Sequence, residues 1–262
     1  MLHDALATLS GSLVGFVLGL IGGGGSVLAV PLLVYVVGVP SPHVAIGTSA
    51  VAVALSALAS LAGHARQDHV KWRCAAVFAA TGVVGALIGS TLGKQFDGQK
   101  LLLLFGVLML VIAGLMFKKK DGQGDAFVTL TRANAPQLLP PLVGYGMVVG
   151  LLSGFFGIGG GFLVVPGLMA ATRMPLIFAV GSSLVSVAAF GITTAGNYAS
   201  SGLIDWMLVA LFIGGGIVGS LLGLRTSTVL ASKKQMLSRT FAIIVAAVGI
   251  YVVLRGFENL IA

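Results

Sequence analysis

Two runs of glycine inside apolar segments constrain the fold of this chain more than any other feature. The first run is Gly22 to Gly25, followed by Pro31, and the second is Gly157 to Gly161, interrupted by Ile158 and followed by Pro166. Each glycine destabilises a helix by about 1 kcal/mol relative to alanine, and proline removes a backbone donor. An apolar helix is therefore expected to break at both places.

The two breaks belong to a duplicated segment. At a constant spacing of 135 residues the identical pairs are Gly15/Gly150, Gly19/Gly154, Gly22/Gly157, Gly24/Gly159, Gly25/Gly160, Leu28/Leu163, Val30/Val165 and Pro31/Pro166. Further along, Gly47-Thr48-Ser49 corresponds to Gly181-Ser182-Ser183, and Trp72 to Trp206. The sequence predicts two transmembrane repeats, residues 1–120 and 142–262, joined by a polar linker at 121–141.

Composition indicates a membrane protein. The chain is 57% hydrophobic and 8% charged, whereas a soluble domain carries roughly 25% charged residues. Apolar stretches of about 20 residues, the length that crosses a bilayer, fill most of the chain. We expect an all-α polytopic membrane protein with about 8 to 10 membrane segments, the first being a retained helix. The lone Cys74 excludes a disulfide within the chain.

The net charge of +8 arises from basic residues in the breaks between spans, so the lipid bilayer and not nucleic acid is the expected partner. Counting each glycine break as two legs gives five segments per repeat. This count puts twelve basic residues on one side of the membrane and only Lys94, Lys100 and Arg255 on the other. The positive-inside rule favours it over four segments. An odd number predicts inverted repeats, with the basic side cytoplasmic and both termini outside.

The predicted interior of the membrane segments contains no Asp, Glu, Lys or Arg, which argues against a carboxylate-based cation carrier. Helix N-termini present unpaired N–H groups and partial positive charge, which suit an anion. The predicted substrate site therefore combines both breaks with hydroxyls of the following spans. Its residues are Gly23, Gly24, Gly25, Ser26, Thr48, Ser49, Gly159, Gly160, Gly161, Ser182 and Ser183.

Other interpretations of these residues remain open. Glycines such as Gly82, Gly85 and Gly89 favour close helix packing, and the hydroxyls could bond to their own helix. His64 and Asn197 stand at span ends, where solvation is the default. A channel or a metal-cation permease is the alternative function, although acidic and cysteine ligands are lacking. No paired carboxylates or HExxH motif indicate an enzyme, and no metal or other cofactor is expected.

The doubled motif resembles the TauE/SafE sulfite-exporter family of membrane permeases. It comprises Gly-Leu-Ile-Gly-Gly-Gly-Gly-Ser with Pro31, Ala45-Ile46-Gly47-Thr48-Ser49, and the second copy with Pro166 and Val180-Gly181-Ser182-Ser183. The resemblance implies a multi-pass carrier in a bacterial inner (plasma) membrane. Its substrate would be a small anion such as sulfite, sulfoacetate or a related sulfonate. Transport by alternating access would centre on a mid-membrane site. The coupling ion and assembly into a homo-oligomer are left open.

Overall fold

A computed structural model describes residues 2–21, 23–118, 128–229 and 234–261. Gly22 of the first glycine run and residues 121–127 of the predicted linker lie outside these ranges. All regular secondary structure within them is helical, which confirms the all-α prediction. The apolar composition and lengths of the helices confirm a polytopic membrane fold.

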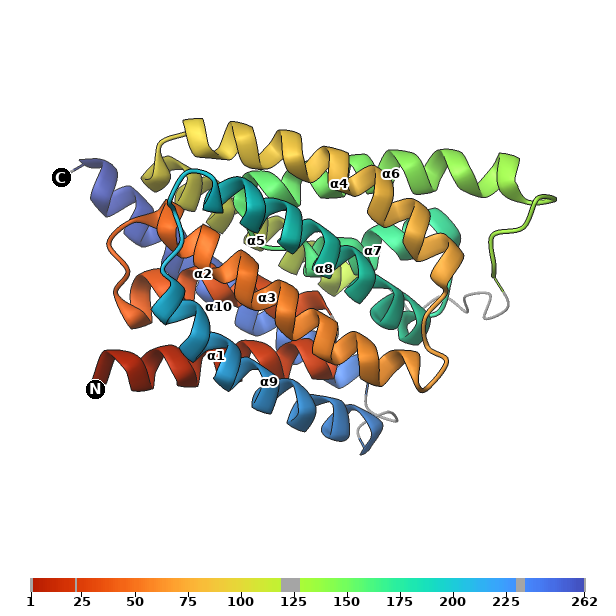
Figure 1. Cartoon of the computed structure of the whole chain (residues 1–262), viewed down its shortest axis with the longest axis horizontal. Coiled ribbons are helices and arrows are strands. Elements are labelled where there is room, and N and C mark those ends of the chain that lie inside the picture. The colour runs from red at the N-terminus through yellow and green to blue at the C-terminus, as the bar shows by residue number, and fades with distance from the viewer. Residues whose placement is uncertain (1, 22, 119–127, 230–233, 262) are drawn as a thin grey trace.

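The long helices follow in a corresponding order in the two halves of the chain, and η1, α2 and η2 of the first half stand where the second half has α7 (Figure 1). In the first half they are α1 (Leu2–Ile21), η1 (Gly23–Leu28), α2 (Ala29–Pro31), η2 (Leu32–Val37), α3 (Pro42–Ala65), α4 (Trp72–Gln95) and α5 (Gly98–Lys118). In the second they are α6 (Ala135–Phe156), α7 (Gly161–Thr172), α8 (Leu176–Ala199), α9 (Trp206–Val229) and α10 (Lys234–Ile261).

Helix length separates full spans from the segments that follow the breaks. Seven helices in the described ranges are long and apolar enough to cross a membrane. The apolar helices at Gly25–Val37 and Gly161–Thr172 are shorter, and at about 1.5 Å per residue each reaches only part of the way across. Each half therefore contains one short apolar helix after its break.

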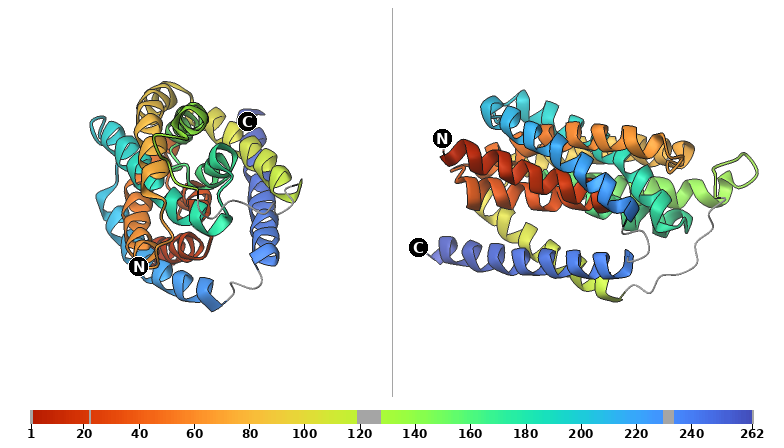
Figure 2. Two further views of the ribbon diagram at one scale, coloured as in Figure 1. Left: turned by 90° about the vertical axis from the view of Figure 1, so that its right-hand side faces the viewer. Right: turned by 90° about the horizontal axis from the view of Figure 1, so that it is seen from below.

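The halves are interleaved. Helix α1 packs along α9 of the other half, and α6 packs along α4. Helix α3 lies against α8, and α5 lies against α10 on one side of the bundle (Figure 2). Each helix of these pairs comes from a different half, so neither half buries its apolar faces alone.

Glycines allow the interleaved helices to approach closely. A Cβ added at Gly15 would collide with the carbonyl oxygen of Gly216 on α9, and one at Gly89 with that of Leu151 on α6. The same holds along both interfaces, at Gly11, Gly19, Gly85, Gly93, Gly150, Gly154, Gly215, Gly219 and Gly223. The interpretation of Gly82, Gly85 and Gly89 as packing surfaces is confirmed.

The ends of the bundle differ in charge. Both termini lie at one end of the bundle, which we call the terminal end, and α4, with Lys94 in its last turn, ends there (Figure 1). The loop between α3 and α4 lies at the other end, which we call the basic end (Figure 1). This loop begins at Arg66 and ends at Lys71, and Arg73 at the start of α4 donates to Leu130 O in the segment before α6. Figure 1 also shows α1 and α6 running in opposite directions. The inverted-repeat relation and its orientation in a membrane stay predictions.

Replacing Gly219 by alanine should destabilise the protein because its Cβ would meet the Ser12 carbonyl and lie 2.8 Å from the Phe16 nitrogen. Overpacking of this kind costs about 1–3 kcal/mol, so the melting temperature in detergent should fall. Gly214→Ala on the same helix is the control, because its Cβ would meet nothing within 4 Å. Equal melting temperatures for the two variants would contradict this account of the α1–α9 interface.

Inverted repeats predict that equivalent loops face opposite sides of the membrane. Gln67 and Ser200 are exposed residues in the loops after α3 and α8. In a Cys74→Ala background, Ser200→Cys should react with an impermeant maleimide added outside intact cells. Gln67→Cys should react only after permeabilisation. Labelling of both from the same side would exclude inversion.

Candidate functional site

The first break folds back onto the helix that precedes it. Helix α1 ends at Ile21 and the chain continues as a 3-10 turn from Gly23 to Leu28. A Cβ on Gly25 would lie 2.5 Å from the Leu18 nitrogen and 2.6 Å from the Val14 carbonyl oxygen. Only glycine permits this backbone contact. Ser26, the next residue, is completely buried.

The second break is a helix end followed by a new helix start. Gly157 takes φ of 66° and closes α6, with Ile158 N donating to Ser153 O at 3.2 Å and Gly157 N to Gly154 O at 3.2 Å. This bond pair defines a Schellman C-cap. Gly159 and Gly160 are also left-handed, with φ of 63° and 69°. Glycine adopts these angles without steric cost, which explains the residue choice.

The start of α7 presents backbone donors inside the protein. Gly160 O accepts bonds from Leu163 N and Val164 N, both at 2.9 Å. Within the described part of the chain, the N–H groups of Gly161 and Phe162 have no acceptor. Both residues are buried. This helix start therefore carries unpaired N–H groups and partial positive charge away from water.

Ser153 adds a hydroxyl to this helix start, and sequence reasoning missed it. It is completely buried, and its Oγ has no hydrogen-bond partner among the described residues. A Cβ built on Gly160 would lie 2.5 Å from this oxygen, so the hydroxyl lies against the N-cap of α7. Ser153 aligns with Leu18 of the first half, so the sequence repeat gave no signal for it.

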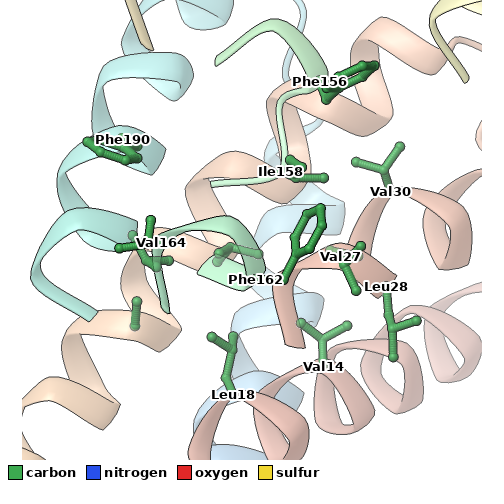
Figure 3. Packing of buried hydrophobic residues seen from close by; sticks show 14 of the residues in the cluster. Val14, Leu18, Val27, Leu28, Val30, Phe156, Ile158, Phe162, Val164 and Phe190 are labelled. Carbon is green, nitrogen blue, oxygen red and sulfur yellow. The ribbon is translucent and has the colours of Figure 1, made fainter. Parts of the chain in front are cut away.

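Apolar side chains join the two breaks in this conformation. Helix α7 packs against η1, and Figure 3 shows Phe162 and Ile158 of the second break beside Val27 and Val30 of the first. All four side chains are buried. The predicted glycine residues of the two breaks thus lie on either side of an apolar contact.

The four predicted hydroxyls divide into two matched pairs. Thr48 Oγ1 accepts a bond from Asp205 N at 3.0 Å, and Ser182 Oγ accepts one from Lys71 N at 2.8 Å. Each of these two hydroxyl oxygens thus accepts a bond from a loop of the opposite half. The hydroxyl hydrogen is not used in that bond. Ser49 Oγ instead donates to Ile46 O at 2.9 Å, and Ser183 Oγ to Val180 O at 2.7 Å. A substrate role for any of the four stays a prediction.

A lysine holds α4 against α8 at the terminal end. Lys94 lies in the last turn of α4 and not in a break between spans, where the sequence placed the basic residues. Its Nζ donates to Asn197 O at 2.9 Å, Asn197 Oδ1 at 2.7 Å and Ser201 Oγ at 2.9 Å. Asn197 Nδ2 in turn donates to Ser90 Oγ at 2.7 Å. The expectation that Asn197 is simply solvated is wrong.

His64 also departs from expectation, because it is only 1% exposed although it stands near the end of α3. The two tryptophans at helix starts, Trp72 and Trp206, are 55% and 65% exposed, as expected of interfacial anchors. No group of three metal-ligating side chains occurs among the described residues.

A pocket of about 360 Å³ opens at the basic end, outside the predicted site. Lys71 and Arg73 line it together with Asp68 and Cys74. Arg73 Nη1 donates to Leu130 O at 3.2 Å, so this pocket joins the start of α4 to the segment that precedes α6.

The bond from Asp205 N gives Thr48 a structural role that can be tested. Thr48→Val should lower the free energy of unfolding by about 1–3 kcal/mol, because it leaves a partly buried N–H without an acceptor. Thr48→Ser keeps the oxygen and should stay near wild type. Chemical denaturation in detergent measures both. Equal stability of Thr48→Val and Thr48→Ser would show that the bond contributes nothing.

The chain is similar over nearly its whole length to a known family. The family model described as "Sulfite exporter TauE/SafE" matches residues 7–252. A "Probable membrane transporter protein" of Xylella fastidiosa (strain Temecula1) is 50% identical over 253 residues, covering 97% of this chain and 96% of the relative. "Probable membrane transporter protein YunE" of Bacillus subtilis is 27% identical over 261 residues, covering 91% of each chain. No solved structure matches the chain.

The matched region runs from α1 into α10 and includes both breaks. Together with the multi-pass helical fold, it shows that the protein belongs to the TauE/SafE family of membrane transporters.

Proposed function

We propose that this protein is a secondary transporter that carries a small sulfur-containing or organic oxyanion, such as sulfite or sulfoacetate, across the bacterial plasma membrane. The start of α7 is the observation that carries the proposal. Unpaired N–H groups of Gly161 and Phe162 and the unpaired hydroxyl of Ser153 meet there in the protein interior. Donors of this kind bind anion oxygens at helix N-termini.

The charge distribution supports an anion as the substrate. No acidic residue of the described ranges is buried, and all of them lie in loops or near helix ends. They are Asp4, Asp68, Asp97, Asp205 and Glu258. A buried carboxylate is the usual means of binding a cation within a membrane protein. The lack of a metal-ligating cluster in the described ranges also weighs against the metal-permease alternative.

The interleaved halves support a carrier with alternating access rather than an open channel. In this conformation the contact between the breaks is made by buried apolar side chains such as Val27 and Phe162. Lys94 and Asn197 hold α4 to α8 at the terminal end. Opening a path to that side would require these bonds to break while the halves rock about the two breaks.

Transport in proteoliposomes tests the function directly. Uptake of labelled sulfite, sulfoacetate and sulfate should exceed that of empty liposomes for at least one of the first two anions. Planar-bilayer recordings should show no unitary current steps, since a carrier gives none. Transport of a metal cation without any of these anions would contradict the proposal.

Ser153→Ala should weaken substrate binding without unfolding the protein, because the hydroxyl has no protein partner to lose. A hydrogen bond to a charged group contributes about 1.5–3 kcal/mol, so KM should rise roughly ten- to a hundred-fold.

Ser12→Ala is the matched control, because Ser12 Oγ donates to Thr8 O on α1 and lies ten residues before Gly22. Its KM should stay at the wild-type value. An unchanged KM for Ser153→Ala, with transport intact, would remove Ser153 from the site.

A further inference from the structure

His64 is a buried imidazole with no hydrogen bond. It lies in the last turn of α3, its exposure is 1%, and neither Nδ1 nor Nε2 has a partner among the described residues. A neutral imidazole carries one N–H donor and one acceptor lone pair. Leaving such groups buried and unpaired costs about 1–3 kcal/mol each. A membrane protein that retains such a residue has a functional reason for it by default.

The surroundings of His64 allow it to take up a proton only with a counter-charge. The nearest titratable ring is His69, whose centroid is 5.9 Å away. The loop that follows α3 also carries Arg66, Asp68 and Lys71, with Arg225 on α9 and Arg173 before α8. Apart from half-buried His69 and Lys71, these groups are exposed to solvent. A buried imidazolium is costly without an anion beside it. Asp68 is the only acidic residue among these groups, and it is exposed.

His64 lies at the same level of the bundle as the first break. Gly19, near the end of α1, packs against Leu224 of α9, because its Cβ would lie 2.8 Å from the Leu224 nitrogen. The Leu224 side chain in turn packs on Gly63, the residue before His64. Through Leu224, the end of α3 that carries His64 is thus packed against the end of the helix that leads into the first break.

Among the buried ionisable side chains of the described spans, His64 is the one whose residue type ordinarily ionises near neutrality. The other buried ionisable side chains there are Cys74 and Tyr198, whose ordinary ionisation lies well above pH 7. His43, at the opposite end of α3, is only partly buried, and its Nε2 is 3.1 Å from Phe96 O. Histidine is the side chain that gains and loses a proton in the physiological range.

We infer that His64 is the proton-binding site that couples this transporter, so that one proton enters with each anion. This inference rests on the proposed anion transport. The proton binds at whichever ring nitrogen carries the lone pair, and the anion supplies the missing counter-charge. The linkage is reciprocal: the anion strengthens proton binding and the proton strengthens anion binding by the same factor.

Proteoliposomes loaded at pH 7.5 and diluted to pH 6.5 test the coupling, with valinomycin and potassium holding the potential at zero. Sulfoacetate is the probe because its charge is constant in this range. With one proton per anion, a one-unit gradient drives up to about tenfold accumulation. A pH dye inside the vesicles should report acidification on adding the anion. Anion uptake without acidification would overturn the proton inference and leave the transport function standing. No uptake of any anion would overturn both.

The His64→Gln variant tests whether the coupling depends on this residue. It should abolish the gradient-driven accumulation while anion-for-anion exchange at equal pH continues, because exchange needs no net proton movement. His43→Gln is the control and should keep the accumulation. Gradient-driven accumulation by His64→Gln would overturn the assignment. If His64→Gln loses exchange as well, His64→Asn is measured in the same way. Exchange without gradient-driven accumulation by His64→Asn supports the assignment, and gradient-driven accumulation overturns it.

Discussion

The physical constraint on which this structure depends is the need to shield broken backbone from lipid. In hydrocarbon every unpaired N–H or C=O group costs several kcal/mol, so irregular backbone survives only where protein surrounds it. Each half departs from α-helix at its break, in the 3-10 turn Gly23–Leu28 and in the turn between Phe156 and Gly161. The helices of both halves must therefore enclose both breaks, and this accounts for the interleaved pairs α1 with α9 and α4 with α6.

Close packing of these pairs follows from small residues and not from strong polar contacts. At the α1–α9 interface, Gly15 and Gly216 allow one backbone to touch the other. Helices in lipid gain little from the hydrophobic effect and associate through such van der Waals contact. Polar bonds instead tie the loops to the bundle, as at Thr48 with Asp205 and at Ser182 with Lys71.

Sequence reasoning predicted the features that depend on local chemistry. The helix breaks at Gly25 and Gly157 and the short legs after them follow from glycine and proline alone. It could not predict that the Thr48 hydroxyl binds Asp205 N, because that bond joins residues 157 apart. It missed Ser153 for the same reason, since its place beside Gly160 exists only once the chain has folded back. The surroundings of His64 likewise depend on the loop beyond α3, where the His69 ring lies beside it.

The repeat matches backbone positions more closely than side-chain chemistry. With the spacing of 134 residues that relates Trp72 to Trp206, Asn197 corresponds to Gly63 and Tyr198 to His64. Asn197 receives the bonds of Lys94, whereas Gly63 contacts only apolar Leu224 among its nearest neighbours. Tyr198 is buried beside His43, and His64 beside His69. The two ends thus differ, with a lysine-linked polar contact at Asn197 at the terminal end and an imidazole, His64, without a hydrogen bond to any described residue at the basic end. In the proposed transport the two ends would present different groups to the anion, so the free energy of opening each end need not be the same. A duplicated backbone can therefore support transport that responds differently to the two sides of the membrane.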